Sequence, residues 1–178
     1  TFSAINLAIS IAMEKDKRVL LIDSDINKPS HYKLFGIDNR PGLTDFLLNE
    51  VSDMGDVLCR TNIPSLSVMS SGKLYEYSTE LLASAAMEKF ILEISSRYKD
   101  RVVIFDSPPL LQTTEASVLA AHMGQIVMVV EAESTQNHIV KKSLGMLSNE
   151  IVLLLLNKQR EKIQEGHYGY GYGYGHQF

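Results

Sequence analysis

Acidic side chains follow two short apolar runs, and their types and spacing suit work on a metal-bound phosphate. Asp23 and Asp25 follow the run VLLI, and Asp106 ends the run VVIFD. Carboxylate oxygens are ligands that Mg²⁺ prefers. Such groups could hold the metal on a phosphate chain and leave one carboxylate to orient or deprotonate an attacking hydroxyl. One aspartate alone commonly caps a turn, but acidic groups at two strand ends favour a functional site.

The C-terminal segment 166–178 reads GHYGYGYGYGHQF and offers a row of phenol hydroxyls. Its tyrosines are Tyr168, Tyr170, Tyr172 and Tyr174, each followed by glycine. Glycine has no side chain to pack and loses much backbone freedom when ordered, so the segment cannot build a core. We expect a disordered tail over 161–178 after one domain over 1–160. A phenol hydroxyl can accept a phosphoryl group, which makes the tail a candidate substrate; a low-complexity tail without chemistry is the alternative.

Composition excludes several classes of protein. The net charge of −4 argues against nucleic-acid binding, which normally needs a basic face. A single cysteine excludes a disulfide within the chain and fits a reducing compartment. No apolar run approaches the roughly 20 residues that span a bilayer. These properties indicate a globular domain with an apolar core.

The elements that must position the aspartates alternate between helix-like and strand-like patterns. Strand, helix and strand in succession predict an α/β fold with a mostly parallel sheet and helices on both faces. In such sheets, ligands bind at the carboxyl ends of the strands. The predicted strands cover 18–23, 65–69, 102–106, 125–130 and 151–156. The predicted helices cover 2–15, 42–49, 114–122, 136–147 and one long helix from Ser78 that carries apolar residues at steps of four up to Tyr98.

Thr1 opens a helix that precedes the Asp23 strand. A phosphate-binding loop, G-x-x-x-x-G-K-[ST], leads straight into such a helix. Thr1 stands where the last residue of that motif would stand, so we expect the glycines and the lysine to precede it. The chain as printed is then expected to bind ATP weakly.

The ordered set of segments resembles the bacterial tyrosine kinase (BY-kinase) family of capsule and exopolysaccharide biosynthesis, within the MinD/ParA-like P-loop superfamily. The matching segments span nearly the whole chain together with the tail. They are TFSAINLAISIA, which begins at the last residue of Walker A, VLLIDSDINKPS as Walker A′, VVIFDSPPLL as Walker B, GLTDFL, and the stretch from Ser71 to Leu82. The tyrosine-glycine ending is most similar to exosortase-associated tyrosine autokinases. The resemblance implies a P-loop three-layer sandwich that uses ATP and Mg²⁺.

The resemblance also implies roles for individual residues. Thr1, Asp25 and Asp106 would bind Mg²⁺, and Asp23 would be the general base toward a tyrosine hydroxyl. Asn157, at the end of the last strand, would contact the adenine, although a turn-forming asparagine is nearly as good an interpretation. Tyr168, Tyr170, Tyr172 and Tyr174 would be the phosphoacceptors.

The sequence departs from the family pattern at two places. Relatives usually carry arginine at the position of Asn27; the adjacent Lys28 supplies charge without the forked geometry of a guanidinium. The asparagine-proline pair before the E-L-L element is replaced by Tyr77-Ser78-Thr79.

The resemblance predicts an autokinase that regulates polysaccharide polymerisation and export. Its implied partners are further copies of the chain in a ring, where each tail enters a neighbour's site, a transmembrane chain-length-determinant or activator protein, and a tyrosine phosphatase. The implied location is the cytoplasmic face of the bacterial plasma membrane. Two alternatives remain: a MinD/ParA-like ATPase that phosphorylates nothing, and a non-catalytic partner domain.

Overall fold

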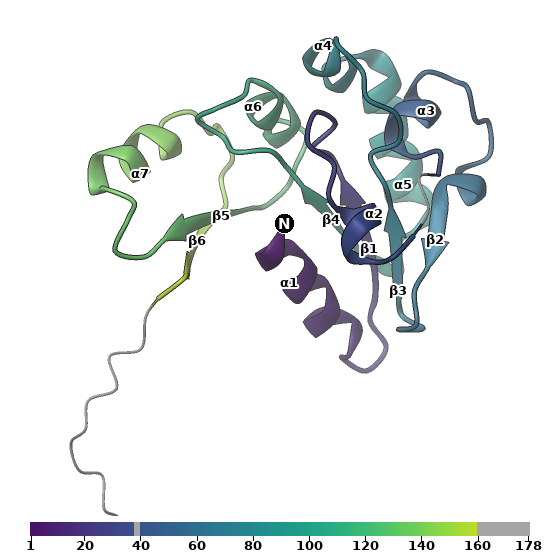
Figure 1. Ribbon diagram of the computed structural model, residues 1–178, viewed down its shortest axis with the longest axis horizontal. Coiled ribbons are helices and arrows are strands. Elements are labelled where there is room, and N and C mark those ends of the chain that lie inside the picture. The colour runs from purple at the N-terminus through teal and green to yellow at the C-terminus, as the bar shows by residue number, and fades with distance from the viewer. Residues whose placement is uncertain (38–39, 160–178) are drawn as a thin grey trace, which may run out of the picture.

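The computed structural model describes residues 1–37 and 40–159, and Figure 1 shows how its elements are arranged. The predicted tail 161–178, with its tyrosines at 168, 170, 172 and 174, lies outside the described residues.

The larger sheet has four strands in the order β2-β3-β1-β4. Its central strand β1 lies parallel to both neighbours, whereas β2 pairs antiparallel with β3 at the edge. Each strand coincides with a short run rich in apolar residues, and β1 is buried on both faces from Val19 to Asp23. The strands are β1 (Arg18–Asp23), β2 (Leu58–Arg60), β3 (Leu66–Met69) and β4 (Arg101–Asp106).

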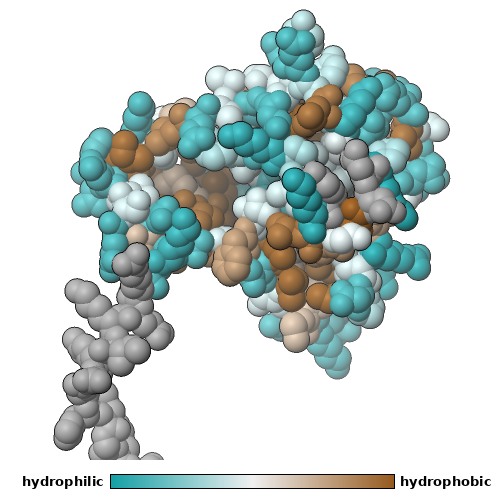
Figure 2. Space-filling model, in the orientation of Figure 1, coloured by the Kyte–Doolittle hydropathy of each residue, from teal (hydrophilic) through white to brown (hydrophobic). Residues whose placement is uncertain are grey.

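The other two strands form a separate parallel pair, β5 (Ile126–Glu131) and β6 (Val152–Asn157). The sequence predicts one sheet, but within the described residues no backbone ladder joins β5 to β4. Figure 1 shows this pair with α7 (Asn137–Leu144) set apart from the larger sheet. Large apolar side chains on the pair stay exposed, Val129 at 47% and Leu156 at 58% among them. Figure 2 accordingly shows apolar surface gathered beside a hollow in this region.

Helices cover both faces of the larger sheet, as the sequence predicts. Successive side chains of a strand point to opposite faces, so the apolar run of β1 serves two cores. Val19 and Leu21 pack in a cluster with α1 (Phe2–Ala12). Leu20 and Ile22 pack in a second cluster with α5 (Ala85–Arg97). The result is the predicted three-layer α/β sandwich.

The prediction of one long helix from Ser78 is wrong. The segment forms α4 (Ser78–Leu82) and then α5, with an extended residue, Ser84, between them. The Ser84 hydroxyl accepts a hydrogen bond from the backbone N–H of Met87, so Ser84 caps a new helix. The apolar residues at steps of four describe the buried face that both helices share.

The remaining elements are short. The helix α6 (Glu115–Ala120) lies within its predicted range, as does α3 (Leu43–Leu47). The sequence did not predict α2 (His31–Leu34), the 3₁₀ helix η1 (Met54–Val57) or β2, because runs of three or four residues carry little periodicity. No helix among residues 1–37 and 40–159 is long and apolar enough to cross a membrane.

A close backbone approach joins the loop after β3 to the start of α3. The Asp45 carboxylate accepts hydrogen bonds from the backbone N–H groups of Gly42, at 2.8 Å, and Lys73, at 3.3 Å. Gly72 has φ +82°, and a Cβ at Gly72 would overlap the Asp45 carboxylate. Glycine is therefore required at Gly72 both by the backbone conformation and by the space.

Candidate active site

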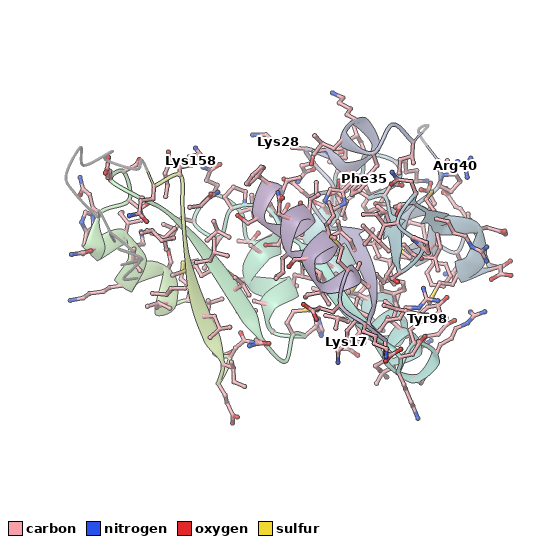
Figure 3. The ribbon with its side chains drawn as sticks, turned by 90° about the horizontal axis from the view of Figure 1, so that it is seen from below. Lys17, Lys28, Phe35, Arg40, Tyr98 and Lys158 are labelled. Atoms are coloured by element: carbon pink, nitrogen blue, oxygen red, sulfur yellow. The ribbon has the colours of Figure 1, made fainter. Side chains whose placement is uncertain are left out.

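Two carboxylates from different strands lie side by side at one edge of the larger sheet. The parallel register of β1 and β4 pairs Asp23 with Asp106. Both residues are buried. Figure 3 shows that this edge is opposite the strand beginnings: Lys28 and Lys158, which follow β1 and β6, lie on one side of the molecule, and Lys17 and Tyr98 lie on the other. The structure therefore brings the two strand-ending aspartates together.

Asp23 organises the segment that follows its own strand, residues 23–30, here called the acidic loop. Its Oδ1 accepts the backbone N–H of Asp25 at 3.2 Å, and its Oδ2 accepts that of Ser30 at 2.9 Å. A third backbone N–H, from His31, reaches Oδ2 at 3.0 Å. Asp23 therefore folds the acidic loop around its carboxylate, and in this arrangement both oxygens are already engaged.

His31 is a residue of this site that sequence reasoning missed. Its Nε2 lies 2.9 Å from Oδ2 of Asp106, and its side chain is completely buried. Its Nδ1 has no hydrogen-bond partner among the described residues, so the ring is held through Nε2. His31 thus contacts both carboxylates, Asp23 by its backbone and Asp106 by its ring. In the sequence His31 stands directly after the Walker A′ segment, eight positions after Asp23, and no local pattern marks it.

Thr1 lies at the same edge. Its amino nitrogen is 3.1 Å from Oδ1 of Asp106, and its hydroxyl is 3.3 Å from that of Ser30. Burial raises the pKa of the Asp106 carboxyl, whereas the hydrogen bonds from His31 and from the Thr1 hydroxyl lower it. Asp106 is therefore ionised at neutral pH.

Asp25 is the more accessible of the two aspartates after β1. Its Oδ1 accepts the backbone N–H of Lys28 at 3.0 Å, and within residues 1–37 and 40–159 no hydrogen bond is made to Oδ2. Burial raises the pKa of Asp25, and the negative charges of Asp23 and Asp106 raise it further, against the lowering effect of Lys28. Asp25 thus keeps an oxygen available for a proton or a ligand.

The donors at this edge fit a magnesium ion. Ligand atoms of Asp23, His31 and Asp106 lie within 4.8 Å of one another, and the Thr1 hydroxyl and the carboxylates are hard oxygen donors of the kind Mg²⁺ prefers. The imidazole nitrogen suits this ion poorly and already hydrogen-bonds Asp106, so His31 is better described as a support of Asp106 than as a ligand.

Asn157 reaches the beginning of α1. Its Nδ2 lies 3.4 Å from the hydroxyl of Ser3, two residues after Thr1. The carboxyl end of β6 is therefore near the edge that carries Asp106, although β6 belongs to the other sheet. This geometry is compatible with the expected adenine contact, which stays a prediction.

Asn27 is bonded to residues of two helices. Its Nδ2 lies 3.0 Å from the hydroxyl of Ser78 and 3.0 Å from Oε1 of Glu115. Where relatives are expected to carry arginine, this chain therefore has a neutral donor against a carboxylate. Neither Ser78 nor Glu115 was predicted to take part.

Comparison with known proteins gives a consistent set of relatives. The AAA domain model matches residues 1–165. Tyrosine-protein kinase YwqD of Bacillus subtilis is 34% identical over 172 residues, which cover 94% of this chain and 71% of that protein. Tyrosine-protein kinase ptk of Acinetobacter johnsonii is 35% identical over 136 residues, 76% of this chain but only 18% of that protein. The chain thus spans most of one relative and a small part of the other.

Among solved structures, the kinase domain of VpsO is similar with a TM-score of 0.81 and 28% identity. The alignment covers 89% of this chain and 77% of that domain. The fold, the paired aspartates at the ends of β1 and β4, and the sequence comparisons therefore point to the same family of proteins.

Proposed function

This chain belongs to the family of bacterial tyrosine-protein kinases, and on that premise we propose that it is the catalytic domain of an ATP-dependent protein-tyrosine autokinase. The observation that carries the proposal is the pairing of Asp23 with Asp106 at the edge that also holds Thr1. Three acidic groups and a hydroxyl converge there, as phosphoryl transfer requires.

Thr1 and Asp106 are the residues proposed to hold Mg²⁺. The Thr1 hydroxyl and the Asp106 carboxylate offer hard oxygens, and His31 fixes one oxygen of Asp106 by its hydrogen bond. Mg-ATP would supply the phosphoryl group to be transferred and release ADP. A metal role for Asp25 stays a prediction from the family resemblance.

Asp25 is proposed to take the proton of the incoming tyrosine hydroxyl. A tyrosine with an ordinary pKa of about 10 is almost entirely protonated at neutral pH and needs a base. The family resemblance gives this role to Asp23, but each Asp23 oxygen accepts at least one backbone N–H and the residue is 1% exposed. Asp25 has an oxygen without such a bond among the described residues, so it can accept a proton without unfolding the acidic loop.

The wider role follows from the resemblance. We propose that the tail tyrosines Tyr168, Tyr170, Tyr172 and Tyr174 are phosphorylated by a neighbouring copy in a ring, and that Asn157 contacts the adenine. A transmembrane activator would hold the protein at the inner face of the plasma membrane, a tyrosine phosphatase would reverse the modification, and the process regulated would be capsule or exopolysaccharide polymerisation and export.

The test uses the natural full-length protein incubated with Mg-ATP. Phosphotyrosine is followed by immunoblot and mass spectrometry, and free phosphate is measured in parallel, with Asp106→Asn as the inactive control. Phosphotyrosine that depends on Asp106 supports the proposal. Phosphate release without phosphotyrosine would instead indicate a MinD/ParA-like ATPase, and the absence of Mg-ATP binding would indicate a non-catalytic partner domain.

A further inference from the structure

A small polar cluster joins the acidic loop to two helices. Its members are Asn27 in the loop, Ser78 at the start of α4 and Glu115 at the start of α6. Asn27 Nδ2 is 3.0 Å from both partners, and the Ser78 hydroxyl donates to Oε1 of Glu115 at 2.7 Å. One carboxylate oxygen thus collects two donors from segments that are far apart in the sequence.

Glu115 is the centre of this cluster and has an unusual environment for a glutamate. It is 8% exposed, and within residues 1–37 and 40–159 it forms no ion pair. Burial raises the pKa of Glu115, but hydrogen bonds from Ser78 and neighbouring groups outweigh burial and lower that pKa. A buried carboxylate of this kind depends on its neutral donors, so removing a donor carries a direct cost.

The cluster adds a further hold on the middle of the acidic loop, beside the hydrogen bond from Lys28 to Asp25 and the buried side chain of Ile26. Asp23 gathers the two ends of the loop through the N–H groups of Asp25 and Ser30. The side chain of Asn27, two residues after Asp25, is the link that carries the middle of the loop to α4 and α6. Through Asn27, Glu115 therefore helps to hold the loop that carries Asp25.

We propose that Glu115 is a positioning residue for phosphoryl transfer, which acts by holding Asn27 and thereby the acidic loop. The inference rests on the proposed function, because positioning has meaning only if Asp25 takes part in catalysis. Within residues 1–37 and 40–159, no hydrogen bond joins the Glu115 side chain to Thr1, Asp25 or Asp106.

The test is an isosteric exchange of charge and amide in the full-length protein. Asn27→Asp removes the donor and sets a second carboxylate against Glu115, so we expect kcat for tyrosine phosphorylation to fall by about 10- to 100-fold, as small misplacements of reacting groups do. Glu115→Gln keeps a carbonyl oxygen that can accept from Asn27 and Ser78, so kcat stays within about threefold of the parent. The double variant N27D/E115Q restores a donor to the new carboxylate and recovers kcat to within about threefold.

The matched control is Asn137→Asp at the exposed first residue of α7, which should leave kcat unchanged. A parent-like kcat in N27D, or an N27D defect that E115Q fails to rescue, would overturn the positioning role. Hydrogen exchange of the loop amides, measured without nucleotide, should rise in N27D and return in the double variant. Hydrogen exchange can be measured even if the parent has no kinase activity. Unchanged exchange in N27D rejects this inference, whereas an inactive parent rejects the proposed function. The two failures are therefore distinguishable.

Discussion

Nε2 of His31 lies 2.9 Å from Oδ2 of Asp106, and this buried contact joins the helix after the acidic loop to the end of β4. The same residue donates its backbone N–H to Asp23. His31 therefore contacts both Asp23 and Asp106, which are paired in the register of the parallel strands β1 and β4.

Replacing His31 tests this support. His31→Phe keeps a ring but leaves the buried Asp106 oxygen without its donor, so we expect the free energy of unfolding to fall by about 1–3 kcal/mol. The Mg²⁺ concentration needed for half-maximal autophosphorylation should rise by about 10- to 100-fold, as for other partners of metal ligands. Chemical denaturation and a magnesium titration of the initial rate measure the two effects. His138→Phe, at an exposed position of α7, is the control, and an unaltered magnesium dependence in His31→Phe would exclude the role.

Ionised Asp25 should lower the free energy of unfolding at neutral pH while it supports catalysis. Because burial and the neighbouring charges raise the pKa of Asp25 above 3.8, its ionisation costs the folded state more than the unfolded state. That cost develops as pH rises from 3.8 through the folded-state pKa and persists at neutral pH. Asp25→Asn should therefore unfold at a higher denaturant concentration than the parent at pH 7, and the difference should shrink below pH 3.8.

The same variant should lose about 10²- to 10⁴-fold in kcat, the usual contribution of a general base. Asp56→Asn, an exposed position in η1, serves as the control for both measurements. An Asp25→Asn protein that is less stable than the parent at pH 7, or as active, contradicts the assignment.

Gly72 should tolerate no side chain. Gly72→Ala combines a positive φ with overlap on the Asp45 carboxylate, so we expect the free energy of unfolding to fall by more than about 2 kcal/mol. Gly36→Ala has a positive φ but open space and should cost about 1–2 kcal/mol. Gly124→Ala has neither constraint and should be close to neutral. Urea unfolding of the three variants gives the order, and equal costs at Gly72 and Gly36 would show that the Asp45 contact does not matter.

The tail tyrosines should carry most of the phosphate. Changing Tyr168, Tyr170, Tyr172 and Tyr174 to phenylalanine in the full-length protein removes the hydroxyls and leaves the aromatic rings. Phosphotyrosine should largely disappear while Mg-ATP binding, measured by calorimetry, is unchanged. Tyr77→Phe, at an exposed position before α4, should have little effect on the total. Undiminished phosphotyrosine in the fourfold variant would move the acceptor site elsewhere.

The sequence predicts the parts of the fold that rest on burial. Apolar runs such as VLLI and VVIFD locate strands β1 and β4, and their terminal aspartates meet as expected because parallel strands end at the same edge. The break at Ser84 was missed because the apolar period continues across it, and only the cap geometry separates α4 from α5.

The polar contacts of the site are harder to predict, because they join residues that no local pattern relates. Asn27 and Glu115 are separated by 88 positions in the sequence, yet share a hydrogen bond. His31 is a single histidine without a second imidazole at ligand spacing, so nothing in its neighbourhood distinguishes it from a solvated side chain. Such contacts depend on strand register and loop path, which sequence periodicity does not encode.

The contact between Asn157 and Ser3 also sets up a competition between two routes of transfer. Strand β6, which precedes the tyrosine-glycine segment in the sequence, ends beside α1. The segment therefore begins its path near the site of its own subunit. The segment 158–167 can extend at most about 35 Å, and an acceptor tethered by a short flexible linker has an effective concentration of the order of millimolar. In the proposed autokinase, transfer to a neighbour therefore competes with an intramolecular reaction whose rate does not change on dilution. Transfer between subunits should slow on dilution, whereas transfer within one subunit should not. The concentration dependence of autophosphorylation therefore measures the share of each route.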